Sequence, residues 1–340
     1  MERVSNVLAK EIMNSYGVSK TPFLFILDYD LRNNIIVPLN QLADLPIAFE
    51  INDRLMHCKS QKAYSVPHYS QTFAIKSSPI SYEQYVKAYQ IVKENLGHGN
   101  SFLANLTSES QIEIDASLEE LFMGAKAPYK LLIEEEFVCF SPETFVQITE
   151  TGEISSFPMK GTADGSKEGA AEALINDLKE KYEHTTIVDL IRNDISAVAE
   201  KVWVERFRYL DTIQKADGQK LLQMSSEIKG QLPKKWSENI GDLLFKLLPA
   251  GSITGAPKPK TMEIIAEAER LTYGAGQKRG YYTGVFGVFD GSQLSSAVMI
   301  RFIEKKEGVL YFKSGGGLTF RSDALKEYKE LISKIYVPIL

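Results

Sequence analysis

The segment SPETFVQITETGEISSFPMKGT, Ser141–Thr162, is predicted to form a β-hairpin. Apolar and polar residues alternate over Phe145–Ile148, as expected of a half-buried strand. Glu150–Gly152 has the composition of a turn, and Ile154–Phe157 is interpreted as the returning strand. The fold is therefore expected to be built around antiparallel strand pairs in this part of the chain.

Two functional groups lie at the outer ends of this segment, Glu143 and Lys160. Because the ends of a hairpin come together, we expect the two side chains to lie near each other. A carboxylic acid and an amine on one substrate can act as proton donor and nucleophile. A surface ion pair worth less than about 1 kcal/mol is the simpler interpretation of the hairpin alone. The choice depends on the rest of the chain.

The composition describes an ordinary globular protein and excludes several classes. The chain has 340 residues, 44% hydrophobic and 24% charged, with a net charge of −5. This charge does not favour a nucleic-acid or anionic-membrane partner. No apolar run is long enough to span a bilayer and the N-terminus lacks an apolar signal core, so a cytoplasmic location is expected. The two cysteines make no disulfide framework.

Periodicity and turn residues predict alternating groups of helices and strands. The predicted helices cover residues 1–20, 82–96, 118–124, 167–195, 237–248, 259–271 and 322–336. Three consecutive antiparallel strands are predicted over residues 282–290, 293–304 and 310–314, separated by Asp-Gly and Glu-Gly turns. Mixed helices and antiparallel strands of this kind indicate an α+β protein.

Two glycine-rich segments were tested for phosphate binding. Gly251–Lys258, GSITGAPK, has Ala256 and Pro257 where a phosphate loop needs glycine and lysine, so nucleotide binding is disfavoured. Its amides remain suited to a carboxylate or a phosphate. Gly315–Gly317 precedes the last predicted helix and would let a ligand approach the backbone closely.

Carboxylates in two predicted helices are candidate metal ligands. Glu327, Glu330 and Lys334 share one face of the last helix, and Glu183 lies in the helix before residue 195. Carboxylate oxygens on one face can bind a hard cation such as Mg²⁺. A solvent-exposed face with a Glu330–Lys334 pair is the alternative. Because His184 has no second histidine four residues away, the zinc-protease motif is absent.

Taken in order, these motifs resemble those of the chorismate-utilising enzymes, the family of anthranilate, aminodeoxychorismate, isochorismate and salicylate synthases. The resemblance covers roughly residues 80–340. The matching pieces are residues 141–143, 158–162, 183–194 and 251–258, Tyr282, Arg301, and residues 315–317 and 327–330.

This resemblance implies two large antiparallel β-sheets packed face to face, with helices outside. It implies one chorismate-binding domain over residues 1–340, with a shortened N-terminal portion at 1–80 and the catalytic core at 81–340. Longer N-terminal parts in the family can bind tryptophan, so an intact tryptophan pocket is not expected here.

The residue at position 160 distinguishes branches of the family. Anthranilate- and isochorismate-forming members typically have alanine there, whereas lysine is similar to the aminodeoxychorismate synthase component I branch. The resemblance implies that Lys160 attacks C2 of chorismate while Glu143 protonates the departing 4-hydroxyl. Ammonia then attacks C4 and expels the lysine, giving 4-amino-4-deoxychorismate, the precursor of p-aminobenzoate and folate. The pKa of Lys160 would have to be lowered for this attack.

The resemblance also assigns binding roles. Glu183 and Glu327, with Glu330 as a direct or water-mediated third ligand, would hold Mg²⁺ against the ring carboxylate. Lys334 would balance this acidic site. The enolpyruvyl carboxylate and the pocket walls would be contacted by Arg301, Tyr282, Gly315, Gly316, Gly317, Gly161, Thr162 and Thr254.

Some features depart from the family or leave alternatives open. Gln223 occupies a position where many relatives have histidine, so it cannot serve there as an acid–base residue. No glutaminase cysteine motif is present, so ammonia would be free or supplied by a separate glutamine amidotransferase subunit. An anthranilate or isochorismate synthase, a catalytically inert chorismate-binding subunit and a pyridoxal-phosphate Schiff-base enzyme are the alternative interpretations.

Overall fold

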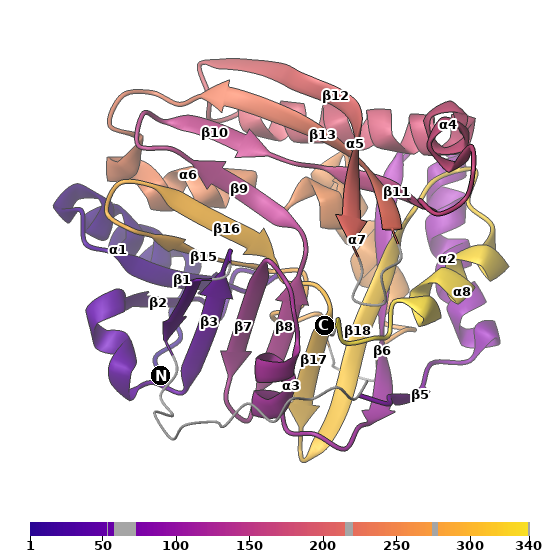
Figure 1. Cartoon of the computed structure of the whole chain (residues 1–340), viewed down its shortest axis with the longest axis horizontal. Helices are drawn as coiled ribbons and strands as arrows, with labels where there is room; N and C mark the ends of the chain where they lie inside the picture. The colour runs from indigo at the N-terminus through magenta and orange to yellow at the C-terminus, as the bar shows by residue number, and fades with distance from the viewer. Residues whose placement is uncertain (53, 58–72, 215–219, 274–277, 339–340) are drawn as a thin grey trace.

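The computed structural model describes residues 1–52, 54–57, 73–214, 220–273 and 278–338. Within these residues two antiparallel β-sheets, each of nine strands, form the centre of the molecule (Figure 1). The first sheet has the order β11-β13-β10-β9-β16-β15-β1-β2, with β12 also paired to β13. The second has the order β14-β6-β18-β17-β8-β7-β3-β4, with β5 paired to β6.

The sheets are assembled from strands that lie far apart in the sequence. The first contains β1 (Phe23–Leu27), β2 (Ile35–Pro38), β9 (Thr144–Ile148), β10 (Glu153–Ser156), β11 (Met159–Asp164), β12 (Lys201–Gln214), β13 (Lys220–Gln231), β15 (Val285–Phe289) and β16 (Leu294–Val298). The second contains β3 (Ile47–Ile51), β4 (Arg54–His57), β5 (Lys76–Ser78), β6 (Leu103–Glu113), β7 (Tyr129–Ile133), β8 (Phe137–Ser141), β14 (Gly255–Ala256), β17 (Phe302–Lys306) and β18 (Val309–Leu318).

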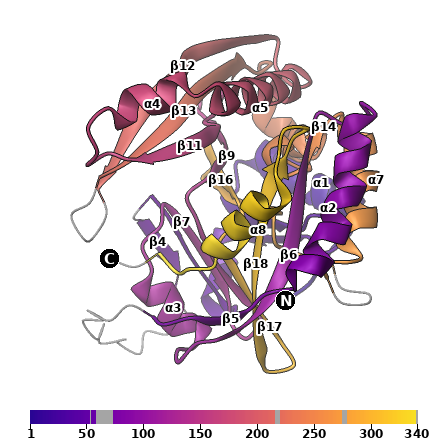
Figure 2. The same ribbon diagram turned by 90° about the vertical axis from the view of Figure 1, so that its right-hand side faces the viewer.

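Helices cover the outer faces of both sheets (Figure 2). The α-helices are α1 (Asn6–Ser19), α2 (Tyr82–Gly97), α3 (Leu118–Gly124), α4 (Ala170–Asn176), α5 (Leu178–Ser196), α6 (Ile240–Leu247), α7 (Lys258–Glu269) and α8 (Ala324–Ser333). Short 3₁₀ turns are η1 (Leu39–Asp44), η2 (Trp236–Asn239) and η3 (Gly251–Ile253). Helices α1, α5 and α6 pack on the first sheet, and α2, α3, α7 and α8 pack on the second.

Strand β1 shows how the two layers are held together. All five of its residues are buried, which a strand with one solvated face would not allow. Leu24 and Ile26 join a core with residues of β3, β7 and β8 in the second sheet. Phe23, Phe25 and Leu27 instead pack with residues of α1, α5 and α6. Alternating side chains therefore fill the interface between the sheets and the outer helical layer, and the predicted α+β fold is confirmed.

The hairpin predicted within Ser141–Thr162 is present. Strands β9 and β10 pair antiparallel, with Ile154 opposite Ile148. The prediction that Lys160 lies at the end of this hairpin is wrong. Strand β10 ends at Ser156, and Lys160 lies in the separate strand β11. Strand β11 pairs with β13 rather than with β9. Lys160 is therefore placed by the β13 pairing and not by the closure of the hairpin.

The predicted three-stranded meander is also wrong in its middle strand. The interval 293–304 contains two strands, β16 in the first sheet and β17 in the second. Arg301 lies in the connection and has a left-handed backbone conformation, with φ of 53°. The chain crosses from one sheet to the other here, so a residue expected inside a strand lies at the junction of the two layers.

Two predicted helices need shorter bounds. The helix expected over 167–195 is divided at Asp177, which has an extended backbone and accepts a hydrogen bond from the Glu180 amide to cap α5. The last helix is capped by Asp323 rather than Ser322, and Lys334 is its C-terminal cap residue. The triple glycine, expected to follow the strand at 310–314, lies within β18.

The helices were also compared with the dimensions of a bilayer. Among the residues that the structure describes, none of the helices combines the length and apolar character needed to cross a membrane.

Candidate active site

Lys160 and Glu183 form an ion pair between β11 and α5. Lys160 Nζ lies 3.1 Å from Glu183 Oε2, and the Glu183 residue is 5% exposed. Burial lowers the pKa of Lys160, but the charges of Glu183, Glu330 and Glu180 outweigh burial and leave that pKa above its usual value. The lowered pKa expected for a nucleophilic lysine is therefore not found in this arrangement, because carboxylates surround the ammonium group.

The end of α8 supplies a second ion pair. Lys334 Nζ lies 2.8 Å from Glu330 Oε1 and donates a hydrogen bond of 2.8 Å to the Gly315 carbonyl. Burial lowers the pKa of Lys334, while Glu330 acts in the opposite direction. Glu327, one turn earlier, is buried. Of the face of α8 predicted from the spacing, Glu327 and Lys334 thus lie toward β18, whereas Glu330 is exposed to solvent.

The charged side chains lie against the glycine backbone of β18. A Cβ atom on Gly316 would lie 3.6 Å from Lys334 Nζ, 3.8 Å from Glu327 Oε2 and 3.9 Å from Glu330 Oε1. A Cβ atom on Gly317 would lie 3.9 Å from Lys160 Nζ. The charged groups of β11, α5 and α8 therefore gather over one stretch of glycine backbone, which we call the charged cluster (Lys160, Glu183, Glu327, Glu330 and Lys334).

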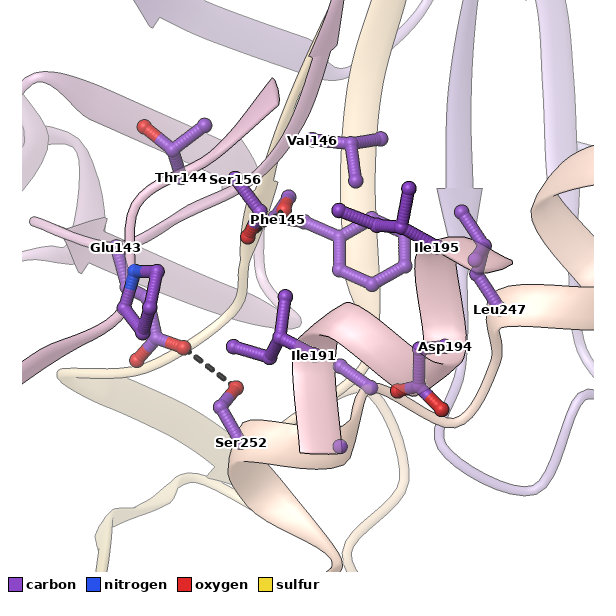
Figure 3. Close-up of a pocket in the computed structure, with 13 residues that line it drawn as sticks. Glu143, Thr144, Phe145, Val146, Ser156, Ile191, Asp194, Ile195, Leu247 and Ser252 are labelled. Atoms are coloured by element: carbon purple, nitrogen blue, oxygen red, sulfur yellow. Dashed lines mark hydrogen bonds between the residues drawn. The ribbon is translucent and has the colours of Figure 1, made fainter. Parts of the chain in front are cut away.

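Glu143 lies just before β9 and contacts the η3 turn (Figure 3). Its Oε1 accepts a hydrogen bond of 2.6 Å from Ser252 Oγ. The residue is half-buried, and desolvation by the surrounding protein raises the pKa of its carboxyl. Ser252 and the positive charges of Arg301, Lys334 and Lys160 act in the opposite direction. Two members of the charged cluster, Lys160 and Lys334, therefore act on the charge of the Glu143 carboxyl.

Arg301 and Tyr282 lie beside this group. The Arg301 guanidinium carbon is 4.9 Å from the centre of the Tyr336 ring, and the buried Nε has no hydrogen-bond partner in the described part of the chain. Tyr282 is buried, and desolvation is the largest of the influences that raise its pKa. A buried guanidinium N–H without a protein acceptor is suited to an anionic ligand.

The remaining predicted pocket residues are less closely joined to the charged cluster. Gly161 has a φ of 90° and lies against Glu180, since an added Cβ would be 2.9 Å from Glu180 Oε2. Thr254 is fully buried and its hydroxyl donates to the Ala250 carbonyl. Thr162 is exposed and pairs in register with Gln223, and no contact joining it to the charged cluster is found within the described residues.

The side chain of Gln223 makes a hydrogen bond to the backbone of β11. Its Nε2 donates a hydrogen bond of 3.1 Å to the Gly161 carbonyl. Gln223 therefore connects β13 to β11 one residue after Lys160. A side-chain amide can make this contact at any ordinary pH because it does not titrate.

Three further residues were missed by sequence reasoning. Ser252 lies in the GSITGAPK segment, whose composition drew attention to its amides rather than to a hydroxyl. Glu180 is adjacent to Gly161 only because α5 packs on β11. Tyr336 follows the last helix, and nothing in its sequence surroundings indicated a contact with Arg301.

The carboxylates were tested as a magnesium site. Their oxygens are the donor type that Mg²⁺ prefers, and two of the three residues, Glu183 and Glu327, are buried. Within the described residues, however, no three acidic, histidine or cysteine side chains converge in a geometry that could hold an ion. Lys160 and Lys334 contact Glu183 and Glu330 instead. The donor chemistry fits Mg²⁺, and the lysine contacts would have to rearrange to admit it.

Comparison with known proteins identifies the family. Residues 30–339 match the family model described as chorismate binding enzyme. The chain belongs to the chorismate-binding enzyme family. It is 45% identical to an "uncharacterized PabA-like protein" of Haemophilus influenzae, over 97% of this chain and 96% of that protein. It is 31% identical to aminodeoxychorismate synthase component 1 of Klebsiella aerogenes, over 83% of this chain and 62% of that protein.

A solved member of the chorismate-binding family has the same fold. The menaquinone-specific isochorismate synthase MenF of Escherichia coli superimposes with a TM-score of 0.69 at 15% identity, covering 97% of this chain and 81% of that one. At this identity the likeness establishes the arrangement of the two sheets and not the reaction. Homologues named as aminodeoxychorismate, anthranilate and isochorismate synthases all occur, so the family alone leaves the product open.

Proposed function

We propose that this enzyme converts chorismate and ammonia into 4-amino-4-deoxychorismate. The observation that carries the proposal is the side-chain amine of Lys160 in a site that also contains a carboxyl with a raised pKa, Glu143. Formation of anthranilate or isochorismate does not require an amine nucleophile from the protein. The similarity to aminodeoxychorismate synthase component 1 supports the same choice.

In the first step Lys160 Nζ bonds to C2 of chorismate, both ring double bonds shift, and the C4–O bond breaks. Glu143 gives its proton to the departing oxygen, so water leaves. In the second step ammonia bonds to C4, both double bonds shift back and the C2–N bond to Lys160 breaks. The new ammonium group on C4 releases a proton, which restores the acid form of Glu143. The balance is one chorismate and one ammonia consumed, with one water and one aminodeoxychorismate formed.

The pKa values of Glu143 and Lys160 determine which of the two side chains is protonated before the reaction. The raised pKa of Glu143 favours the protonated form that an acid needs. The raised pKa of Lys160 means that its ammonium must lose a proton before attack, and carboxylates hold that proton in place. Any positive charge that engages Glu183 or Glu330 would weaken this hold.

Magnesium would supply such a charge and would bind the ring carboxylate of the substrate. We propose Glu183 and Glu327 as its protein ligands, with Glu330 binding directly or through water and Lys334 balancing the acidic site. Arg301 and Tyr282 would bind the enolpyruvyl carboxylate, and Gly161, Thr162, Thr254 and the glycines of β18 would line the pocket. Ammonia would come from a separate glutamine amidotransferase subunit, in the cytoplasm.

The proposal is tested by incubating the protein with chorismate, MgCl₂ and ammonium, and analysing the products by chromatography with mass and ultraviolet detection. Aminodeoxychorismate is expected, and its formation should be lost in Lys160→Ala. Anthranilate or isochorismate as the main product would assign one of the alternative reactions. Unchanged chorismate that nevertheless binds to the protein would indicate a binding subunit. Either result would overturn the proposal.

A further inference from the structure

Glu143 lies at one side of a small cavity whose walls are mainly apolar (Figure 3). The cavity volume is about 20 Å³, which is room for about one water molecule. Ser252 lines the same cavity and is the hydrogen-bond partner found for the Glu143 carboxyl in the described part of the chain. The apolar lining is contributed by Phe145, Val146, Ile191, Ile195, Leu247 and Ala250. In such surroundings one hydroxyl group has a large influence on the carboxyl.

The turn that presents Ser252 is held from two sides. Lys258 Nζ lies 2.8 Å from Asp194 Oδ2 on α5 and donates to the Leu247 carbonyl at 2.8 Å. On the other side the buried Arg279 donates to the Ile253 carbonyl at 2.9 Å. Arg279 thus holds one carbonyl of η3, and Lys258 ties together the elements on either side of it. The hydrogen bond from Ser252 to Glu143 is formed without a substrate.

We propose that Ser252 is a positioning residue that donates its hydroxyl hydrogen to Oε1 of Glu143, so that the acidic proton resides on Oε2. A carboxylic acid carries one proton, and the oxygen that accepts a short hydrogen bond is the less favourable place for it. Oε2 then remains to donate to the departing substrate hydroxyl. This inference rests on the proposed role of Glu143 as the acid.

The groups near Glu143 determine whether its pKa should rise or fall when the Ser252 hydroxyl is removed. Burial raises its pKa, whereas Ser252, Arg301, Lys334 and Lys160 lower it. Asp194 lines the same cavity, and its charge is matched by Lys258. Removing the Ser252 hydroxyl takes away one lowering influence and leaves the others in place, so the pKa of Glu143 should rise further.

The test compares Ser252→Ala with Ser156→Ala. Ser156 lines the same cavity, but its hydroxyl donates to the Phe145 carbonyl at 3.0 Å. The carbonyl stretch of protonated Glu143, assigned with Glu143→Gln, is followed against pH by infrared difference spectroscopy of the free protein. Ser252→Ala should raise the midpoint by about one pH unit, because a hydrogen bond to a charged group is lost. Ser156→Ala should leave the midpoint unchanged.

Kinetics give the second readout. With chorismate and ammonium, kcat of Ser252→Ala should fall about tenfold or more, with KM changed less than about twofold. Ser252→Thr retains a hydroxyl and should restore both the midpoint and kcat. If Ser252→Ala does not fold, Ser252→Cys, with a similar volume and a weak donor, replaces it and should give the same upward shift.

An unchanged midpoint in the variant that lacks the hydroxyl would overturn the inference, and so would equal effects of the Ser252 and Ser156 substitutions. The infrared titration requires no substrate. It therefore tests the Ser252–Glu143 pair even if the wild-type protein makes no aminodeoxychorismate, and failure of the proposed function can be distinguished from failure of this inference.

Discussion

Two ion pairs in this protein have the same chemistry and different surroundings. Arg279 and Glu269 are both buried, with Arg279 Nη2 2.7 Å from Glu269 Oε1. The Arg279 guanidinium also donates to the Ile253 and Asn105 carbonyls, and Thr107 donates to Glu269. This pair is saturated with protein partners and connects β6, α7 and η3.

The Lys160–Glu183 pair, in contrast, is surrounded by further charged side chains. Glu330 and Glu180 also influence Lys160, and Lys334 approaches from α8. Around Arg279 and Glu269, hydrogen bonds from the protein compensate for desolvation. Around Lys160 and Glu183, charged groups of both signs lie near one another, as they often do at functional sites. We therefore expect that saturation of the hydrogen-bond partners, rather than burial alone, separates a structural ion pair from one that takes part in the proposed reaction.

The largest expected effect is the loss of product in Lys160→Ala. The amine is the proposed nucleophile, so aminodeoxychorismate formation should fall to the background rate while the thermal unfolding temperature changes little. Lys235→Ala, at an exposed lysine near η2, is the control. If the Lys160→Ala protein aminates C4 at the wild-type rate, Lys160 is not the nucleophile and the proposed role of the Lys160–Glu183 pair is wrong.

Glu143→Gln should lower kcat by about 10²–10⁴-fold, the usual contribution of a general acid. Its effect on chorismate affinity should be smaller, because the amide has nearly the same shape. In the wild type, activity should decrease as pH rises through the raised pKa of Glu143, since the acidic form is consumed. The glutamine variant should lack this alkaline decrease, which a pH–rate profile will show.

Arg279→Met tests the structural pair. It leaves the Glu269 carboxylate buried without its partner, so the free energy of unfolding should decrease by about 3–5 kcal/mol. Urea denaturation followed by circular dichroism measures this change. The double variant Arg279→Met/Glu269→Gln should recover part of the loss, whereas Lys160→Met should cost much less. Equal losses in the two regions would contradict the distinction drawn between them.

Removal of magnesium should affect the charged cluster but not the Arg279–Glu269 pair. With excess chelator, chorismate amination should fall at least tenfold while the unfolding temperature changes little, because the structural pair does not involve the metal. Isothermal titration with MgCl₂ should detect binding that is weakened in Glu327→Gln. Full activity in the chelated protein would contradict the proposed metal requirement.

The smallest effect is expected at Tyr336, whose ring lies over the Arg301 guanidinium. Ile335 and the buried Val337 pack with the α3 core, and the Lys126 amide donates to the Pro338 carbonyl, so the segment is anchored on both sides. Tyr336→Leu should raise KM for chorismate by about threefold, the value of one exposed cation–π contact. Tyr336→Phe keeps the ring and should behave as wild type; a similar rise in KM would instead implicate the hydroxyl.

Local patterns predicted many of the helices and strands. The alternation in β9 and β10 predicted the hairpin, and the spacing of Glu327, Glu330 and Lys334 predicted their common face. The order of the motifs indicated the family. These features depend on periods of two and about 3.6 residues and on residue types, which the linear sequence contains directly.

Contacts between distant segments were decided by the tertiary structure alone. The change of sheet at Arg301, the contact of Ser252 with Glu143 and the position of Tyr336 over Arg301 join residues that the sequence separates widely. The raised pKa of Lys160 likewise follows from carboxylates on α5 and α8. Sequence determined which chemical groups are present, whereas packing determined their charge states, because electrostatic energies depend on distance and desolvation in space.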